Sequence, residues 1–309
     1  MKGQKKLIYL KIKIDFLFLN ILFKMNIYFT DYKVSTITCN ANIGNNIDID
    51  LSILFEHITP SEENNNIIWI QNLRDNSQFT KGTYPKKIRK SKKKNKKKNR
   101  FDNQITIIFK IDINYMPNIK IFKNGNIQLT GIKKTNDTDY IAYHIINKIK
   151  DIYNNIDKNI DKNNNNDFIN SLEYSNFKIR MINTDFKTYT DDKLKNKFII
   201  RRKDLHNILI SKKYNNKSSF QPGIYQGVKL EYYYNKNNDG KCICEFHSFN
   251  KKNISTDCKK VTVAIFESGS VLITGGITFE QVQRAYEYIT SIIRDNAETI
   301  YKPQLNIIT

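Results

Sequence analysis

Two segments of this chain, residues 118–151 and 260–295, repeat one pattern, and this repeat constrains the fold more than any other feature. The gap-free matches pair Phe122 with Phe266, Gly125 with Gly269, Thr130 with Thr274 and Gly131 with Gly275. A chance match in an isoleucine-rich chain would recover isoleucines rather than a phenylalanine, a threonine and two glycines. The chain therefore contains two copies of one structural unit.

Each copy has the pattern of a β-hairpin followed by a helix. In the first copy, alternating strands over 119–122 and 127–130 flank the turn dipeptide Asn124-Gly125. Isoleucines 141, 145, 149 and 152 then mark one face of a helix. The second copy predicts strands over 261–266 and 271–274, a turn at Ser268-Gly269, and a helix that begins near Phe279.

More elements are predicted upstream of each hairpin. The first half has strands over 33–42 and 104–110 with a short helix over 50–57. The second half has strands over 177–185 and 228–234 with a helix over 202–211. Strands followed by one long helix, twice, predict an α+β fold: a curved antiparallel sheet built from two pseudo-symmetric repeats, with helices on one face. The other face is then free to bind a partner.

The charge balance favours a polyanionic partner. The 309 residues carry a formal net charge of +21, which is typical of proteins that bind nucleic acid or an acidic surface. Residues 86–100 hold 11 basic residues in 15, and without them the charge is still +10. We expect this run to be disordered when unbound and to contact phosphates, with Lys97 and Arg100 among its contacts. A nuclear localisation signal or a merely solvated loop are the alternatives.

Composition shifts suggest the domain limits. We assign an N-terminal extension (1–29), a first repeat (30–153, with the basic insertion 86–100), an Asn/Asp-rich linker (154–170), a second repeat (171–301, with a cysteine-containing insertion 235–260) and a C-terminal tail (302–309). The apolar stretch 7–23 is interrupted by Lys11, Lys13 and Asp15, so it does not predict a membrane span. Met25 is an alternative start, and we expect an intracellular protein.

The two motifs IFKNGNIQLTG and IFESGSVLITG, each followed by an amphipathic helix, resemble the doubled motif of the TATA-box-binding protein family. The resemblance implies a saddle-shaped sheet that binds and bends AT-rich promoter DNA through the minor groove, as a monomer. It also implies recruitment of a TFIIB-like factor and RNA polymerase. The Ile/Asn/Lys-rich composition and long insertions resemble versions from large DNA viruses, which would act in the nucleus or in a viral factory in the host cytoplasm.

The resemblance assigns roles to particular residues. The aromatic wedges would be Phe101, Phe122, Tyr225 and Phe266, with Phe220 as the fallback for Tyr225; the groove-facing residues would be Thr130, Thr274, Val34 and Ile182. For the phenylalanines the alternative is ordinary core packing. At the two positions where the family has central asparagines, this chain has Tyr32 and Arg180. Gln128 stands where a groove-facing apolar residue is expected. We therefore expect a looser preference for deformable AT-rich DNA.

Other chemistry has little support in the sequence. No Walker loop, G-x-S-x-G or H-E-x-x-H motif is present, so we expect no enzyme and no cofactor. Cys242, Cys244 and Cys258 lack the usual zinc spacing, and we expect free thiols and no metal; a zinc clip completed by His247 is the alternative. Binding of single-stranded DNA or RNA, or DNA packaging, on the same fold is the alternative function.

Overall fold

A computed structural model describes residues 25–44, 47–61, 66–74, 77–84, 103–156, 162–237, 240–244 and 258–303. Within these residues the chain forms two compact units. Residues 34–183 make the first-repeat unit, while the described residues up to Lys33 and from Thr184 onward make the second-repeat unit. Among the described helices, none combines the length and the apolar character that crossing a membrane requires.

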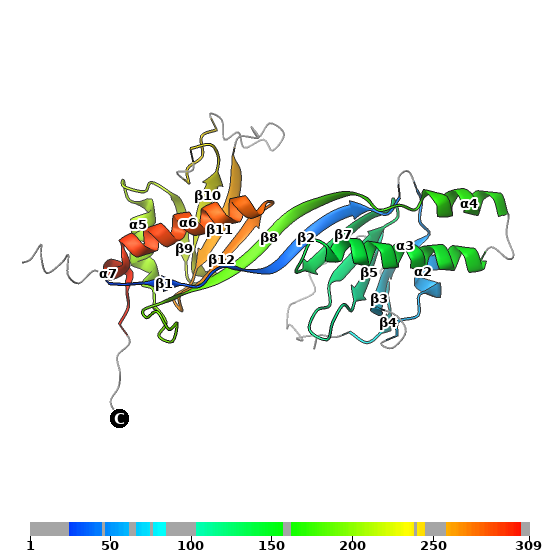
Figure 1. The fold of residues 1–309 in the computed structure, drawn as a ribbon, viewed down its shortest axis with the longest axis horizontal. Helices are drawn as coiled ribbons and strands as arrows, with labels where there is room; N and C mark the ends of the chain where they lie inside the picture. The colour runs from blue at the N-terminus through cyan, green and yellow to red at the C-terminus, as the bar shows by residue number, and fades with distance from the viewer. Residues whose placement is uncertain are drawn as a thin grey trace, which may run out of the picture. The chain divides into compact units, whose positions relative to one another are not determined.

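In the residues that the structure describes, the first-repeat unit is an antiparallel sheet with three helices (Figure 1). Its strands are β2 (Lys33–Asn42), β3 (Ile67–Arg74), β4 (Ser77–Gly82), β5 (Gln104–Phe109), β6 (Asn118–Phe122), β7 (Asn126–Ile132) and the first part of β8 (Ser175–Tyr189), in the order β4-β3-β5-β6-β7-β2-β8. Its helices are α2 (Leu51–His57), α3 (Asp137–Ile156) and α4 (Lys162–Ser171).

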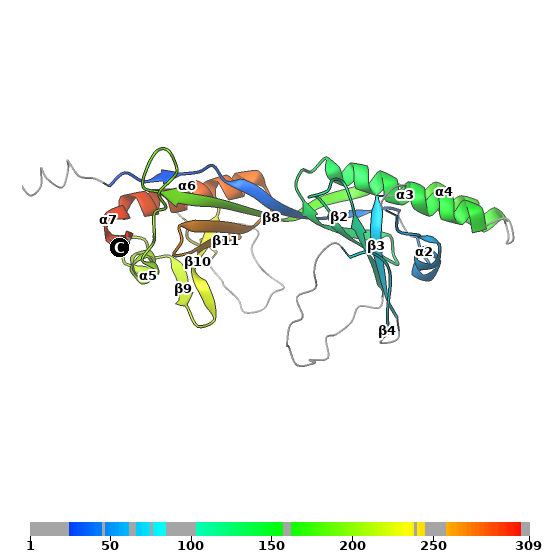
Figure 2. The same ribbon diagram turned by 90° about the horizontal axis from the view of Figure 1, so that it is seen from below.

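The second-repeat unit has the same design. Its strands are β1 (Tyr28–Phe29), the rest of β8, β9 (Lys217–Gln221), β10 (Tyr225–Tyr234), β11 (Lys259–Ile265) and β12 (Ser270–Gly276). They run in the order β8-β12-β11-β10-β9, with β1 paired to β8. Its helices are α5 (Arg202–Ile210), α6 (Phe279–Asp295) and α7 (Ala297–Ile300), and α6 lies along one face of the sheet (Figure 2). The predicted α+β class, with a helix-covered antiparallel sheet in each repeat, is confirmed.

The long helices pack by the faces that the sequence predicts. The isoleucines at 141, 145, 149 and 152 of α3 are all buried, as are Val282, Ala285, Ile289 and Ile292 of α6. The side chain of Thr278 accepts from the backbone N–H of Gln281 and thereby fixes the start of α6. An apolar stripe of this kind anchors each helix to its sheet.

Backbone geometry supports the internal repeat independently of side chains. The hairpin glycines Gly125 and Gly269 both have φ of 77°, in the left-handed region that favours glycine. In each turn the glycine N–H donates to the carbonyl of the preceding phenylalanine, at 3.0 Å to Phe122 and 3.1 Å to Phe266. The strand, turn and strand of both copies thus share one conformation.

The start of the short helix is also repeated. The carbonyl of Lys123 accepts from the backbone N–H of Ile49 at 2.8 Å, and that of Glu267 accepts from Ile200 at 2.9 Å. Helices α2 and α5 each begin two residues after the residue whose N–H donates, at Leu51 and at Arg202. The repeat therefore includes the short helix as well as the hairpin.

Two features differ from the predicted segmentation. The predicted Asn/Asp-rich linker is helical over much of its length, because α3 continues to Ile156 and α4 begins at Lys162. The N-terminal segment belongs to the second-repeat unit, where Thr30 accepts at its carbonyl from the hydroxyl of Tyr286 at 3.0 Å. Phe29 of this segment packs on Phe186, with ring centroids 6.3 Å apart.

Candidate nucleic-acid interface

Each sheet has one face buried under helices and one face that no described helix covers, which we call the open face. In the first-repeat unit, Ile105, Ile121, Ile127 and Ala41 form a cross-strand row and are buried. The next row points to the other side and reads Thr106, Lys120, Gln128 and Asn40. The open face of this unit is thus polar along the row where an apolar surface is expected.

The open face of the second-repeat unit is hollowed. One row across β9 to β12 reads Lys217, Glu231, Thr262 and Thr274, and the next reads Ser219, Lys229, Ala264 and Leu272. These residues and Tyr225 line a hollow of about 500 Å³. The groove-facing role given to Thr274 stays a prediction, and its place on this face is compatible with it.

Phe122 and Phe266 occupy matching places at the ends of their strands. Both are partly exposed, whereas their strand neighbours Ile121 and Ile265 are fully buried. Because successive side chains alternate across a strand, both rings belong to the open face. These two phenylalanines are thus not buried in the core between the sheet and the helices.

Tyr225 lies against Phe266. The ring centroids are 5.7 Å apart, and the Lys229 ammonium sits 4.2 Å from the Tyr225 ring centroid. Gly227 makes this possible, since a Cβ there would come within 2.9 Å of Tyr225 and 3.2 Å of Phe266. A small aromatic cluster with a neighbouring cation therefore ends the open face.

Phe220, the fallback for Tyr225, belongs to the opposite face. The Arg202 guanidinium carbon lies 5.4 Å from its ring centroid, and the His206 ring is 6.4 Å away. Both partners belong to α5, so Phe220 packs on the helix-covered side and the fallback role is corrected. Sequence reasoning missed Ile224, which is 84% exposed in the turn directly before Tyr225.

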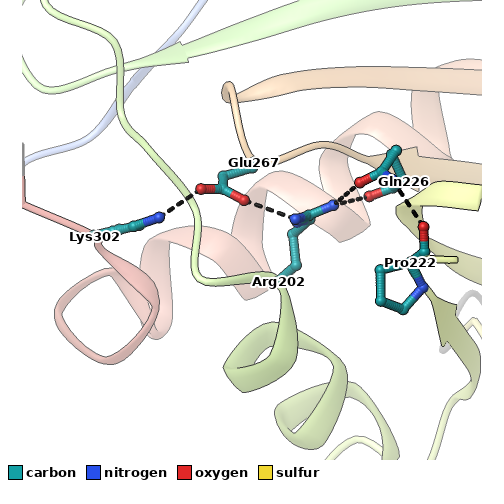
Figure 3. A network of polar contacts seen from close by, with 5 residues as sticks. All are labelled: Arg202, Pro222, Gln226, Glu267 and Lys302. Atoms are coloured by element: carbon teal, nitrogen blue, oxygen red, sulfur yellow. Dashed lines mark hydrogen bonds and ion pairs between the residues drawn. The ribbon is translucent and has the colours of Figure 1, made fainter.

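A polar network fixes the position of this aromatic cluster (Figure 3). Arg202 donates through Nη2 to Glu267 Oε2 at 2.8 Å and through Nη1 to Gln226 Oε1 at 3.0 Å; it also donates to the Gln226 carbonyl. Lys302 donates to the other Glu267 oxygen at 2.7 Å. Gln226 and Glu267 directly follow Tyr225 and Phe266, so the network joins the two strand ends that carry the aromatic rings.

One acidic residue interrupts the basic character of the open face. Glu231 accepts from Lys217 at 3.1 Å, from Lys260 at 3.5 Å and from the Tyr233 hydroxyl at 2.7 Å. Burial alone would raise the pKa of Glu231, but the hydrogen bonds from Tyr233 and Lys217 and the nearby charge of Lys260 lower it overall. The carboxylate is therefore neutralised within the face, which reduces its repulsion of a phosphate backbone.

The assignment of Ile182 is corrected. Ile182 is fully buried, on the same face of β8 as Thr184 and Phe186, so it does not reach the open face. The open-face positions of β8 are the half-buried Met181 and Asn183 on either side. A shift of one residue exchanges the two faces of a strand, and the sequence alignment was one residue out of register here.

Val34 and Thr130 lie on the open face, and their groove-facing roles stay predictions. Val34 shares its face of β2 with Thr38, which pairs with Thr130 of β7. The Thr130 hydroxyl donates to the Asn118 carbonyl at 3.3 Å. Phe101, Lys97, Arg100 and His247 lie outside the described residues, so their roles stay predictions.

Comparisons with known proteins agree with this geometry. The family model of "Transcription factor TFIID (or TATA-binding protein, TBP)" matches residues 204–296, which run from α5 through α6. A protein of Acanthamoeba polyphaga mimivirus described as "TATA-box-binding protein-like" is 31% identical over 280 residues, or 84% of this chain. The chain is thus similar to TATA-binding-protein-like proteins. The internal repeat extends the likeness to the first-repeat unit, which the family model does not match.

The similarity to these proteins is partial. The chain spans 64% of the length of the mimivirus protein. The TBP of Methanococcus jannaschii is a solved structure with a TM-score of 0.43 and 17% identity, covering 86% of this chain and 99% of its own. The expected resemblance to viral versions is confirmed by the mimivirus relative. The TBP-like family is a DNA-binding family without catalytic activity.

Proposed function

We propose that this chain is a transcription-initiation factor that binds AT-rich duplex DNA through the minor groove and bends it. The matched placement of Phe122 and Phe266 carries the proposal, since each ring ends the open face of its own sheet beside a left-handed glycine. Rings inserted between base steps unstack them at a cost of a few kcal/mol per step, and the bent duplex then contacts more protein. Pyrimidine–purine steps such as TA deform at lower cost, which favours AT-rich sites that contain them without a strict consensus.

The open face suggests how much sequence information such a factor reads. Gln128 and Lys120 stand in the middle of the first-repeat face, and Lys229 stands beside the aromatic cluster of the second. Lysines at these places favour contact with phosphates, which adds affinity but no sequence information. We therefore propose a preference for deformable AT-rich DNA, with the basic run 86–100 adding salt-dependent affinity.

The protein partners that we propose for the helix-covered sides are inferred only from the similarity to the TATA-binding-protein family. A TFIIB-like factor and RNA polymerase would contact the helix-covered sides, and the factor would act in the nucleus or in a viral factory. Exposed aromatic side chains on these helices, Tyr143 of α3 and Phe279 of α6, are available for such contacts.

The test of DNA bending is energy transfer between the labelled ends of short duplexes at fixed salt, AT-rich against GC-rich. We expect bending of the AT-rich duplex, and its loss in the double variant F122A/F266A. The control variant Y143A/F279A removes two exposed aromatic rings from helices and should bend DNA like the wild type. Equal binding of both duplexes without bending would overturn the proposal.

The alternative functions predict different outcomes in the same assay. Removing residues 86–99 abolishes binding if the protein packages DNA through its basic run, whereas our proposal predicts weaker binding that still favours AT-rich duplex. Competition with single-stranded DNA or RNA addresses the other alternative. A single strand that displaces the duplex at equal nucleotide concentration would favour single-strand binding through stacked aromatic rings.

A further inference from the structure

Three thiols meet at the far end of strands β10 and β11 from the aromatic cluster. The Sγ atoms of Cys242, Cys244 and Cys258 all lie within 4.8 Å of one another, although Cys258 is 14 residues from Cys244 in sequence. In a tetrahedral zinc site with Zn–S bonds of about 2.3 Å, ligand sulfurs stand roughly 3.8 Å apart. The three sulfurs are thus close to the separation that one shared metal ion requires.

The surrounding backbone holds this geometry. Cys258 directly precedes β11, and Cys242 and Cys244 follow Gly240, whose carbonyl accepts from the backbone N–H of Tyr233 in β10 at 3.1 Å. Gly240 has a φ of 73° and packs so closely on Tyr288 of α6 that a Cβ would lie 2.7 Å from the ring. The segment with the first two cysteines is therefore fixed against the sheet and α6.

A buried amide connects the two cysteine-bearing segments. Asn235 is 4% exposed, and its Nδ2 donates to the Lys241 carbonyl at 2.7 Å and to Cys258 Sγ at 3.4 Å. The backbone N–H of Ile243 donates to the same sulfur at 3.4 Å. Donors aimed at a ligand sulfur are the outer-shell contacts that orient thiolates in metal sites. The sulfur of Cys258, which accepts from Asn235 and from the Ile243 N–H, is thus arranged as a thiolate ligand would be.

We propose that Cys242, Cys244 and Cys258 bind a zinc-class divalent metal ion. The three thiols would each release a proton to water as a metal–sulfur bond forms, and a further ligand would complete the tetrahedron. Soft thiolate ligands select zinc over magnesium or calcium. The ion closes the base of the insertion between β10 and β11 and so fixes the strand ends opposite Tyr225 and Phe266. The proposal takes up the zinc-site alternative and differs from the expectation of free thiols without a metal.

The test is metal binding by the full chain, purified under reducing conditions and stripped with a chelator. We expect one Zn²⁺ per chain by titration, and a cobalt-loaded form with the intense sulfur-to-metal absorption of thiolate ligands. C242S and C258S should each weaken binding at least about 100-fold, and N235A about 10- to 100-fold. C39S removes the buried thiol of the first-repeat unit and is the matched control with unchanged affinity.

A second readout separates a metal site from a failure to fold. Hydrogen exchange of residues 240–244 and of the start of β11 should speed up when the chelator removes the ion, while exchange of β12 stays constant. The proposal is overturned if C258S binds zinc as tightly as C39S does. It is also overturned if zinc leaves these exchange rates unchanged, or if mass spectrometry finds two of the three cysteines as a disulfide in the freshly reduced, metal-treated chain. DNA bending is scored separately, since either proposal can fail alone.

Discussion

The Arg202 guanidinium lies 2.8 Å from the Glu267 carboxylate, and this ion pair joins the residue after Phe266 to the helix α5. The same guanidinium holds the side chain and the carbonyl of Gln226, the residue after Tyr225. One arginine thus ties together the two strand ends that carry the aromatic cluster. Its rigid fork of donors is suited to this, because a lysine could not reach both partners at once.

Replacing Arg202 with methionine should destabilise the second-repeat unit by about 1–3 kcal/mol, since the partly buried carboxylate of Glu267 loses one of its two donors. The Arg202 side chain is only 18% exposed, whereas Lys302, on the other oxygen of Glu267, is 54% exposed. K302M should therefore cost at most about 1 kcal/mol. Urea unfolding followed by circular dichroism compares the two variants. Equal losses would show that Arg202 is no more than a surface ion-pair partner.

The same carboxylate predicts a pH dependence. Hydrogen bonds from Lys302 and the nearby charge of Arg202 lower the pKa of Glu267 below its usual 4.5. A lowered folded-state pKa stabilises the protein above pH 4.5, and this stabilisation is lost as the pH falls through the folded-state value. E267Q should thus be less stable than the wild type at pH 7, with the difference shrinking below pH 4.5. Unfolding curves at pH 7, 5, 4 and 3 measure it, and a constant difference would contradict the assignment.

Ile224 is expected to take part in DNA binding. It is 84% exposed at the tip of the turn beside Tyr225, where an apolar side chain gains nothing from the fold. I224E should weaken binding to AT-rich duplex by roughly tenfold or more, about 1.4 kcal/mol, because it places a negative charge beside phosphates. I113E changes an isoleucine that is 73% exposed in the first-repeat unit and serves as the control. Gel-shift titration at fixed salt compares them, and equal weakening would remove Ile224 from the interface.

Much of the fold was predictable because the sequence of each repeat marks where its strands, turns and helix begin and end. The strands β2, β6 and β7 and the helices α2, α3, α5 and α6 lie where the alternation, turn glycines and apolar stripes predict them. The placement of Phe122 and Phe266 on the open face follows from the same alternation. These are local signals, which a sequence contains in full.

The errors arise where the fold depends on distant partners. The face of Ile182 depends on the register of a 15-residue strand, and no turn near Ile182 fixes it in the sequence. Phe220 and Tyr225 are both aromatic residues beside one turn, and the packing of Arg202 and His206 against Phe220 places it on the other face. The helix α4 is formed by a segment whose Asn/Asp-rich composition is typical of loops.

The two glycines of the second hairpin that have positive φ, Gly269 and Gly275, should differ in their tolerance of a side chain. Gly275 has a φ of 95° but open surroundings, with the nearest atom 3.6 Å from a Cβ, so G275A should cost only the strain of a left-handed residue, about 1–2 kcal/mol. At Gly269 a Cβ would also meet the Thr188 hydroxyl at 2.4 Å and the Phe198 carbonyl at 2.5 Å. G269A should therefore destabilise the unit by at least about 1 kcal/mol more than G275A. Chemical unfolding of both variants measures this difference. If the two substitutions cost the same, the crowding around the Phe266 turn does not contribute to its rigidity.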